Sequence, residues 1–501
     1  MDGIKKKAAL SSPFALLQDF LVVTNASWDV SDQEKADWIG AYVDQINPLV
    51  FSELWRGRGS NPHPPAAMFK LAIFQILKKN LSPAKWAREV LSDSILQTLI
   101  SNITPSRTAL YNFQDRIGTI IERIGQSLIA HSIALGILEP SVVALDGTSI
   151  RSYGSRHRIV NQKTLSRRRN ELSDAITRDN SGEICAASPA WMGKTVNGRL
   201  SQKESYDKAD LILAQRIIEN TTKRKASRRP VDEIFISLSD PESALSRDKE
   251  NVYCPMYCGQ LLTDTKSSLI LSMSLSSHVT DVGKIGPMID QVETTLGIKL
   301  NEIHADAAYS SLLDVKACLE RNVNLLAPVQ ENSLTKAKQS NKAPKQLSRE
   351  HFQYNPKTHS YTCPAGHAMA YYDRDNRKRS NGILVIERFR QSAVKCQACP
   401  LAEQCLRGAK QRSVARTIGQ EVIDAQKAKM TEEIAMASRV LRAQTVERTN
   451  ADIKHRIGLR RFGVTTLQRA KNCLALTIFV LNLMTVRRLL VHASNPTKET
   501  T

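Results

Sequence analysis

Hydrophobic positions recur at helical spacing through the first part of this 501-residue chain. Segments 64–80, 82–100 and 104–136 place apolar side chains on one face after a Pro, Ser or Thr start, as amphipathic helices do. The pattern predicts a helical N-terminal domain over residues 1–138. Lysines and arginines on its polar faces favour a DNA-binding role, although an ordinary helical domain shows the same pattern.

Beyond residue 138 the pattern changes to short apolar or β-branched runs bounded by polar turns. Four such runs lie at residues 141–145, 269–276, 300–305 and 323–329. An amphipathic helix is predicted over residues 309–322, between the last two runs. Strands alternating with a helix indicate an α/β core.

Charged and polar stretches divide the remainder of the chain. The expected segments are a core at 139–330 with a basic insertion at about 155–250, a linker with a cysteine-bearing insertion at 331–408, a helical segment at 409–492 and a disordered tail at 493–501. The linker and the tail contain too few apolar residues to build a packed core.

Residues 473–486, CLALTIFVLNLMTV, form the most apolar run of the chain. This run is shorter than the roughly 18 residues that a spanning helix needs, and it contains Thr and Asn, so it predicts a buried helix. The apolar stretch near the N-terminus is interrupted by Ser, Pro, Gln and Asp and makes a poor signal peptide. We therefore expect no membrane association and a cytoplasmic protein.

The charge balance points to the kind of partner. The chain has 70 Lys and Arg against 49 Asp and Glu, which gives a net charge of +21, and its pI is near 9.6. Such an excess favours a polyanion, because each neutralised phosphate releases condensed counterions. Nucleic acid is the leading interpretation, and a ribosome-associated or anionic-membrane protein would share this composition.

Two aspartates follow predicted strands and precede small residues. Asp146 ends the apolar run at 141–145 and is followed by Gly-Thr, and Asp306 follows the run at 300–305. In open α/β sheets, ligands bind outside the carboxyl ends of strands. A carboxylate there suits a metal-assisted reaction, whereas a lone Asp before Gly-Thr is also typical of a turn or a helix cap.

A third acid, Glu447, lies in a predicted helix together with Lys454, seven positions later. The two side chains share a face about 10 Å apart, since each residue rises ~1.5 Å. Three carboxylates beside basic residues suit two-metal phosphoryl chemistry, in which carboxylate oxygens hold two Mg²⁺ and nearby arginines hold the DNA strand. Taken alone, Glu447 is more typical of a solvated helix residue.

These residues match the motifs of a known family. The segments LDGT (145–148), ADAAY (305–309) and TVERTNADIKHRIGLRRF (445–462) resemble the three catalytic motifs of bacterial insertion-sequence transposases of the DDE type. The segment ITPSRTALYNFQDRIG (103–118) is similar to the end of that family's helical N-terminal domain. The resemblance runs from about residue 45 to 490.

The resemblance implies an α/β fold with an RNase H-like mixed-sheet core, an N-terminal helical domain and insertions. It implies that Asp146, Asp306 and Glu447 are catalytic and bind two Mg²⁺, for which Mn²⁺ can substitute. It assigns DNA contacts to Lys454, Arg442, Tyr309 and Arg448.

Two positions depart from the family pattern. Ala308 replaces a frequent Gly before the tyrosine, and Ala443 stands where an arginine usually precedes the glutamate by four, with Arg442 one step away. The segment at 240–264 resembles a block of one branch of these transposases, and Asp240 in it is a further candidate acid.

Four of the nine cysteines are spaced like the ligands of structural zinc. Cys363, Cys396, Cys399 and Cys405 form the candidate Zn²⁺ site, with His367 as an alternative fourth ligand. Reduced cysteines in a small β insertion are the alternative. Without a secretory signal, thiols are expected to stay reduced.

The leading hypothesis is therefore a DNA transposase that cuts at element ends and joins the freed 3′-hydroxyl to target DNA. Its expected partners are double-stranded DNA, at terminal inverted repeats and target sites, and a second copy of the chain in the DNA complex. Two alternatives stay open: a transposase-derived DNA-binding protein without catalysis, and an RNase H-like nuclease that does not join strands.

Overall fold

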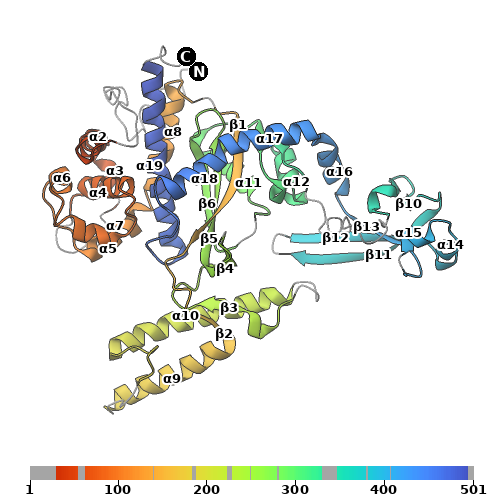
Figure 1. Cartoon of the computed structure of the whole chain (residues 1–501), viewed down its shortest axis with the longest axis horizontal. Coiled ribbons are helices and arrows are strands. Elements are labelled where there is room, and N and C mark those ends of the chain that lie inside the picture. The colour runs from red at the N-terminus through yellow and green to blue at the C-terminus, as the bar shows by residue number, and fades with distance from the viewer. Residues whose placement is uncertain are drawn as a thin grey trace.

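The computed structural model describes residues 30–52, 54, 63–138, 140–182, 188–222, 228–248, 250–278, 281–329, 347–379, 382–406 and 408–494. Helices pack beside a central sheet, and a helical hairpin and a β-rich module project from it in two other directions (Figure 1). The N-terminal lysine-rich stretch, the linker up to residue 346 and the tail from residue 495 lie outside the described residues.

The central sheet mixes antiparallel and parallel strands. Its strands are β1 (Val142–Arg151), β4 (Ala244–Arg247), β5 (Tyr253–Asp264), β6 (Ile270–Ser276), β7 (Glu302–His304) and β8 (Asn324–Leu326). The order is β4-β5-β1-β7-β8, and β6 also pairs with β5. β1 is antiparallel to β5 and parallel to β7, which is parallel to β8. The α/β class and the four predicted strands are confirmed, whereas β4 and β5 have no predicted counterpart.

Helices cover this sheet and complete its connections. They are α11 (Ile285–Leu296), α12 (Leu312–Glu320), α16 (Gln420–Lys429), α17 (Glu432–Gln444), α18 (Val446–His455) and α19 (Leu467–Ser494), with the short 3-10 helix η4 (Ala307–Tyr309) before α12. α12 confirms the predicted helix; it begins where the hydroxyl of Ser311 accepts a hydrogen bond from the amide of Asp314.

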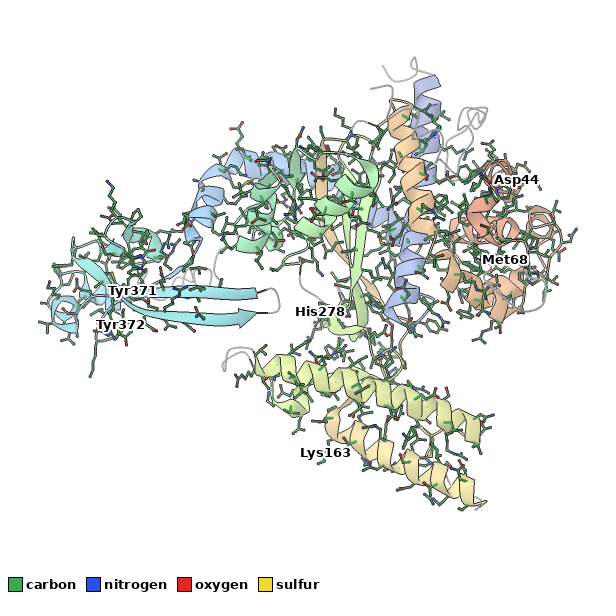
Figure 2. All side chains as sticks on the ribbon, turned by 180° about the vertical axis from the view of Figure 1, so that it is seen from behind. Asp44, Met68, Lys163, His278, Tyr371 and Tyr372 are labelled. Atoms are coloured by element: carbon green, nitrogen blue, oxygen red, sulfur yellow. The ribbon has the colours of Figure 1, made fainter. Side chains whose placement is uncertain are left out.

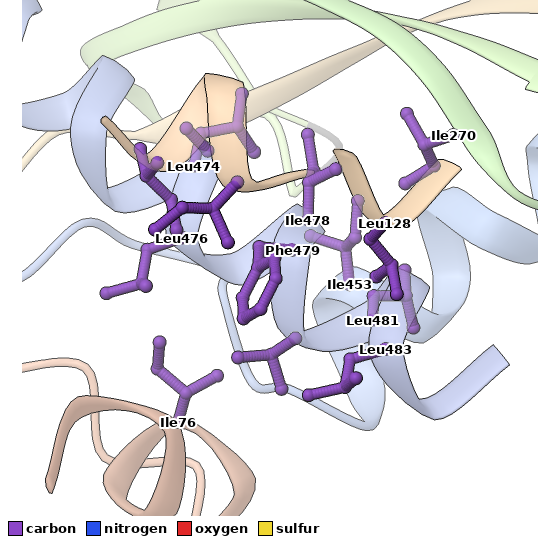
Figure 3. Packing of buried hydrophobic residues seen from close by; sticks show 14 of the residues in the cluster. Ile76, Leu128, Ile270, Ile453, Leu474, Leu476, Ile478, Phe479, Leu481 and Leu483 are labelled. Atoms are coloured by element: carbon purple, nitrogen blue, oxygen red, sulfur yellow. The ribbon is translucent and has the colours of Figure 1, made fainter. Parts of the chain in front are cut away.

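The N-terminal region is helical, and it shares one core with the sheet. Its helices are α2 (Asp32–Asp44), α3 (Leu49–Ser52), α4 (Pro65–Leu77), α5 (Pro83–Glu89), α6 (Ser94–Leu99), α7 (Arg107–Ile117) and α8 (Ile121–Ala134). One continuous cluster of buried apolar side chains includes Ile76 of α4, Leu128 of α8 and Ile270 of β6 (Figure 3). The N-terminal helices are therefore continuous in packing with the residues predicted as a separate core.

α19 joins these parts. It is the one helix of the described chain that is long and apolar enough to cross a membrane, yet 78% of its apolar window is buried inside the protein. Leu474, Phe479 and Leu483 lie in the common cluster (Figure 3). The buried helix predicted at 473–486 is confirmed, and it is longer than the apolar run because its polar ends pack as well.

The first insertion is a helical hairpin with its own small core. α9 (Gln162–Ser181) and α10 (Val196–Thr221) pack together, and β2 (Ile159–Asn161), the 3-10 helix η3 (Val231–Glu233) and β3 (Phe235–Ser237) close its base. Leu165, Leu172 and Leu213 are buried in a cluster separate from the main core.

The second insertion is a β-rich module. It contains the 3-10 helix η5 (Arg349–His351), β9 (Gln353–Asn355), β10 (Ser360–Thr362), β11 (Ala368–Arg379), β12 (Gly382–Arg390), α14 (Ala393–Gln397), α15 (Ala402–Leu406) and β13 (Ser413–Thr417). β13 pairs with β12, so the module extends past residue 408, and the prediction of helix from residue 409 is wrong for this stretch. Lys163 of α9 and Tyr371 and Tyr372 of β11 lie on the two separate extensions (Figure 2).

Candidate active site

Asp146 lies where the parallel pairing of β1 stops. β7 pairs with residues 142–144 of β1, while β5 continues alongside β1 from 143 to 151. The prediction that Asp146 ends a strand is therefore wrong, because β5 extends the hydrogen-bonded ladder past it. The carboxylate nevertheless lies just beyond the segment of β1 that pairs with β7, where no strand of the described chain pairs with that edge of β1.

Asp306 lies beside Asp146 by register. Ala144 is paired with His304, and the two aspartates follow this pair by two residues each. Side chains two positions apart point to the same face, and neighbouring strands lie about 4.8 Å apart. Asp306 also caps η4, since its Oδ1 accepts a hydrogen bond from the amide of Ala308 at 2.8 Å.

The third acid is brought to the same place by α18. Asn450, one turn after Glu447, donates from Nδ2 to Oδ2 of Asp146 at 2.9 Å. This contact fixes α18 against the unpaired edge of β1. Asn450 was not among the predicted site residues, although its position three residues after Glu447 placed it on the same helix face.

A break between two helices positions Arg442. α17 ends and α18 begins at Thr445, which has φ −114° and ψ −94° and so interrupts the helical path. Across the break, Nη2 of Arg442 donates to Oε1 of Glu447 at 2.7 Å. Ala443, at the position where the family pattern has arginine, is exposed. The break therefore lets an arginine five residues ahead reach the glutamate.

The surroundings make Asp146 hard to ionise. Burial is the main cause that raises its pKa to about 6, and Asp306 adds a smaller rise. The guanidinium of Arg442, the amide of Asn450 and the backbone N–H of Gly147 act in the opposite direction. A carboxyl whose charge is opposed by burial and by a neighbouring acid is suited to bind a cation.

The oxygen atoms of the three acids and of Asn450 are of the kind that a divalent cation prefers. In this structure, however, the three acids do not form one ligand group. Among the described residues, no three His, Cys, Asp or Glu side chains lie close enough to hold one metal ion. The guanidinium of Arg442 is hydrogen-bonded to the carboxylate of Glu447. Without a cation between them, carboxylates also repel each other. However, Oδ1 of Asn450 is buried without a hydrogen-bond partner beside Asp146, and such an oxygen suits a hydrated Mg²⁺.

The predicted DNA contacts take different positions. Lys454 follows Glu447 by two turns on the same helix, as expected. Arg448 is exposed on a different face of α18. Tyr309 is 1% exposed, and its hydroxyl donates to Oε1 of Gln260. The prediction that Tyr309 contacts DNA is therefore corrected: its ring is a core residue beneath the aspartates.

A polar network supports the site from below. Gln260 of β5, which bonds Tyr309, donates from Nε2 to Oδ1 of Asp281 at 2.6 Å. A Cβ at Gly147 would come within 3.1 Å of that carboxylate oxygen and within 3.2 Å of Nε2 of Gln260, so a larger residue would have to displace these side chains by a few tenths of an ångström. Nothing in the sequence around Asp281 pointed to this contact.

Asp240 has a structural role and not a metal-binding role. It is 1% exposed and accepts hydrogen bonds from the hydroxyls of Ser152 and Tyr257 and from the amide of Thr466. Three donors occupy its oxygens and tie together β1, β5 and the start of α19. The interpretation of Asp240 as a further metal-binding acid is therefore corrected.

The four candidate zinc cysteines converge in the β-rich module. Cys363, Cys396, Cys399, Cys405 and His367 line one cavity of about 30 Å³. The amide of Arg412 donates to Sγ of Cys396 at 3.5 Å. Burial raises the pKa of the Cys405 thiol, and the other three cysteines add to this rise.

Comparison with known protein families gives one match. Residues 362–487 match the family described as Transposase DDE domain. The matched range holds the cysteine cluster, Arg442, Glu447 and Lys454, while Asp146 and Asp306 lie before it. Neither curated proteins nor solved structures give a match.

The fold and the site thus define an α/β protein in which Asp146 of a mixed sheet lies near Asp306 and is contacted by Asn450 of the helix that carries Glu447. Over residues 362–487 the chain is similar to the DDE domain of transposases.

Proposed function

We propose that the chain is a DNA transposase that cleaves DNA at element ends and transfers the freed 3′-hydroxyl into target DNA. The observation that carries this proposal is the contact between Asn450 and Asp146, which holds the helix of Glu447 against Asp146 of β1, the residue near which Asp306 lies. The family match supports DNA as the partner, and so does the net charge of +21.

The strand order supports an RNase H-like core. β6, β5 and β1 form an antiparallel series, and β7 and β8 then continue in parallel with β1. In this arrangement Asp146 lies in β1, Asp306 follows the neighbouring strand β7 by two residues, and a late helix, α18, contacts Asp146. We propose that this is the catalytic core and that the two insertions are additions to it.

Asp146, Asp306 and Glu447 would hold two Mg²⁺, with Mn²⁺ as a substitute. The ions would activate the attacking water or 3′-hydroxyl and stabilise the leaving oxygen. Arg442 would then be released from Glu447 and become available to a phosphate. Lys454, two turns along the same face, would bind the DNA strand beside the cut.

Catalysis at paired ends implies two copies of the chain on the DNA. A chain that acts on chromosomal or plasmid DNA would work in the bacterial cytoplasm, at the nucleoid. We propose both the homodimer in the DNA complex and this location as consequences of the transposase assignment.

The test is cleavage of duplex DNA that carries the sequences flanking the reading frame, with Mg²⁺ or Mn²⁺. Asp146→Asn, Asp306→Asn and Glu447→Gln should each lower the cleavage rate by roughly 100-fold or more, because each removes a cation ligand. Asp290→Asn, an exposed acid of α11 paired with Arg321, is the matched control.

The outcomes separate the alternatives. Cleavage followed by joining to a target plasmid supports transposition, and cleavage without joining indicates a nuclease. If the wild-type protein binds DNA but does not cleave with either metal, the chain is a DNA-binding protein and the proposal fails.

We further propose that the four cysteines bind a structural Zn²⁺. The four residues line one cavity, although no three of their side chains lie close enough in this structure to hold one ion. The Arg412 amide donates to Cys396, as backbone amides do to metal-bound thiolates. The module has a core of only a few buried side chains, including Phe352, Tyr361 and Phe389, and small cores need a further staple.

Metal analysis of purified protein tests this proposal. Wild-type protein should carry close to one zinc per chain, and Cys399→Ser should lose it, whereas Cys254→Ala, a buried thiol of β5 outside the module, should keep it. A wild-type protein without zinc after growth in zinc-supplemented medium would refute the site.

A further inference from the structure

Three arginines gather on the side of α18 that faces away from the carboxylates. Arg448 and Arg456 of α18 and Arg488 of α19 line one small pocket with Asp452 and Thr449. Residues 448, 452 and 456 form one stripe of α18, because a helix turns about 100° per residue. By the same geometry, this stripe lies roughly 150° around the helix from Glu447 and Lys454.

The residues that line the pocket carry three guanidinium groups and one carboxylate. Among the described residues that line it, Asp452 is the one carboxylate, and it pairs with Nε of Arg456 at 2.9 Å. Burial lowers the pKa of Arg488, and Arg448 and Arg456 lower it further. The attraction of Asp452 is the smallest of these influences. An anion in the pocket would relieve this repulsion.

Rigid elements present the three arginines. Ile453 of α18 and Leu481 of α19 belong to the buried cluster (Figure 3), and Leu481 and Met484 form the floor of the pocket. The hydroxyl of Thr485, on the pocket wall, donates to the carbonyl of Leu481 at 2.9 Å. The guanidinium groups are therefore carried by two packed helices, which suits recognition of a fixed phosphate.

We propose that this pocket binds a backbone phosphate of DNA. The stripe of residues 448, 452 and 456 faces away from Glu447. The phosphate that the pocket binds therefore belongs to a different stretch of DNA from the strand that lies at the carboxylates. The proposal rests on the proposed function, since it takes DNA to be the partner. It adds a second DNA contact on α18, so one helix would hold the reacting strand on one face and another stretch of duplex on the opposite side.

The test measures binding of a fluorescein-labelled duplex by anisotropy over a series of KCl concentrations, without divalent metal. Arg448→Gln combined with Arg456→Gln should reduce the slope of log affinity against log salt by about 0.9 for each phosphate that the protein no longer neutralises. Lys299→Gln, an exposed lysine at the opposite end of β7 from Asp306, controls for the removal of a charge. Replacement of both arginines by lysine should restore part of the slope.

Several outcomes would overturn the proposal. A slope equal to that of wild type in a folded double variant means that DNA does not use the pocket. If phosphate stabilises the wild type more than chloride at equal ionic strength, and the double variant loses this effect but keeps its slope, the pocket takes a free anion. A lowered melting temperature with an unchanged slope would mean that the arginines are structural. Failure of the transposase assignment appears instead as absent cleavage, which these binding measurements do not involve.

Discussion

Asp146 is a carboxyl group that its own fold holds ready for a cation. The rise of its pKa from 3.8 to about 6 corresponds to roughly 3 kcal/mol in favour of the protonated form. Because the folded pKa lies above the ordinary value, the group stabilises the fold at low pH, and this contribution is lost as the pH rises through 6. Bound cations would reverse that balance by favouring the charged form.

Arg442 is the strongest of the groups that keep this pKa from rising further. Arg442→Gln should therefore move the acidic limb of the pH–rate profile for DNA cleavage to higher pH, since Asp146 must lose its proton to bind metal. The rate on that limb should fall about tenfold for each unit of displacement. The measurement is single-turnover cleavage from pH 5 to 8 at fixed, subsaturating Mg²⁺.

Arg442→Lys serves as the control, because it keeps the positive charge and should return the limb toward its original position. If Arg442→Gln lowers the rate equally at every pH, Arg442 acts on the DNA rather than on Asp146. In that case the electrostatic role assigned to the guanidinium is wrong.

Single residues show which parts of the site the sequence could predict. Asp146, Asp306 and Glu447 were selected because apolar strand patterns and a helix pattern preceded or surrounded them. The contact of Arg442 with Glu447 could not be predicted, because it depends on the backbone of Thr445 between two helices. The resemblance assigns Tyr309 to DNA, and its burial could not be predicted because it depends on neighbours such as Gln260 that are distant in sequence.

At the scale of elements, strands that are short runs of apolar residues could be predicted from the sequence. Strands that mix apolar and polar residues could not. The runs at 269–276 and 323–329 are short, apolar and bounded by turns. β5 is buried along nearly its whole length but contains the buried polar residues Gln260, Thr263 and Asp264. Asp281 and Tyr309, the partners of Gln260, are distant from it in sequence. The pattern of β5 has neither alternation nor a continuous apolar run.

The long strands of the β-rich module escape prediction for a different reason. β11 and β12 pair mainly with each other, and many of their side chains are charged, such as Arg374, Arg377 and Arg388. β11 therefore leaves no periodic hydrophobic signal, and the apolar run of β12 at 383–386 is short and gives way to charged residues. The ladder of backbone hydrogen bonds and cross-strand ion pairs, for example Arg388 with Asp373 at 2.6 Å, holds the two strands together.

At the scale of the molecule, the buried apolar side chains of the described residues form three separate clusters. The largest joins the N-terminal helices, the sheet and α19, and the helical hairpin and the β-rich module each have their own. The sequence suggested a border near residue 138 because the periodicity changes there. The packing does not separate the two parts at residue 138, because α19, more than 300 positions later, supplies apolar side chains to both the N-terminal helices and the sheet.

This division predicts how the molecule responds to a cavity in α19. Phe479 is 2% exposed, and its ring centroid lies 5.4 Å from that of Phe69 and 6.3 Å from that of Tyr42. Phe479→Ala should lower the free energy of unfolding of the shared core by about 3–5 kcal/mol. Hydrogen exchange followed by mass spectrometry should then show faster exchange in α4, α8 and β6 together, because one cooperative unit loses stability.

The two insertions should behave differently in the same experiment. Amides of α9, α10 and β12 should keep their wild-type protection in Phe479→Ala, since Phe479 contributes to neither of the smaller clusters. Leu213→Ala, a fully buried residue of the hairpin cluster, is the converse control and should speed exchange in α9 and α10 alone. Equal loss of protection across all three parts in both variants would mean that the chain unfolds as a single unit, and the insertions would then depend on the shared core for their stability.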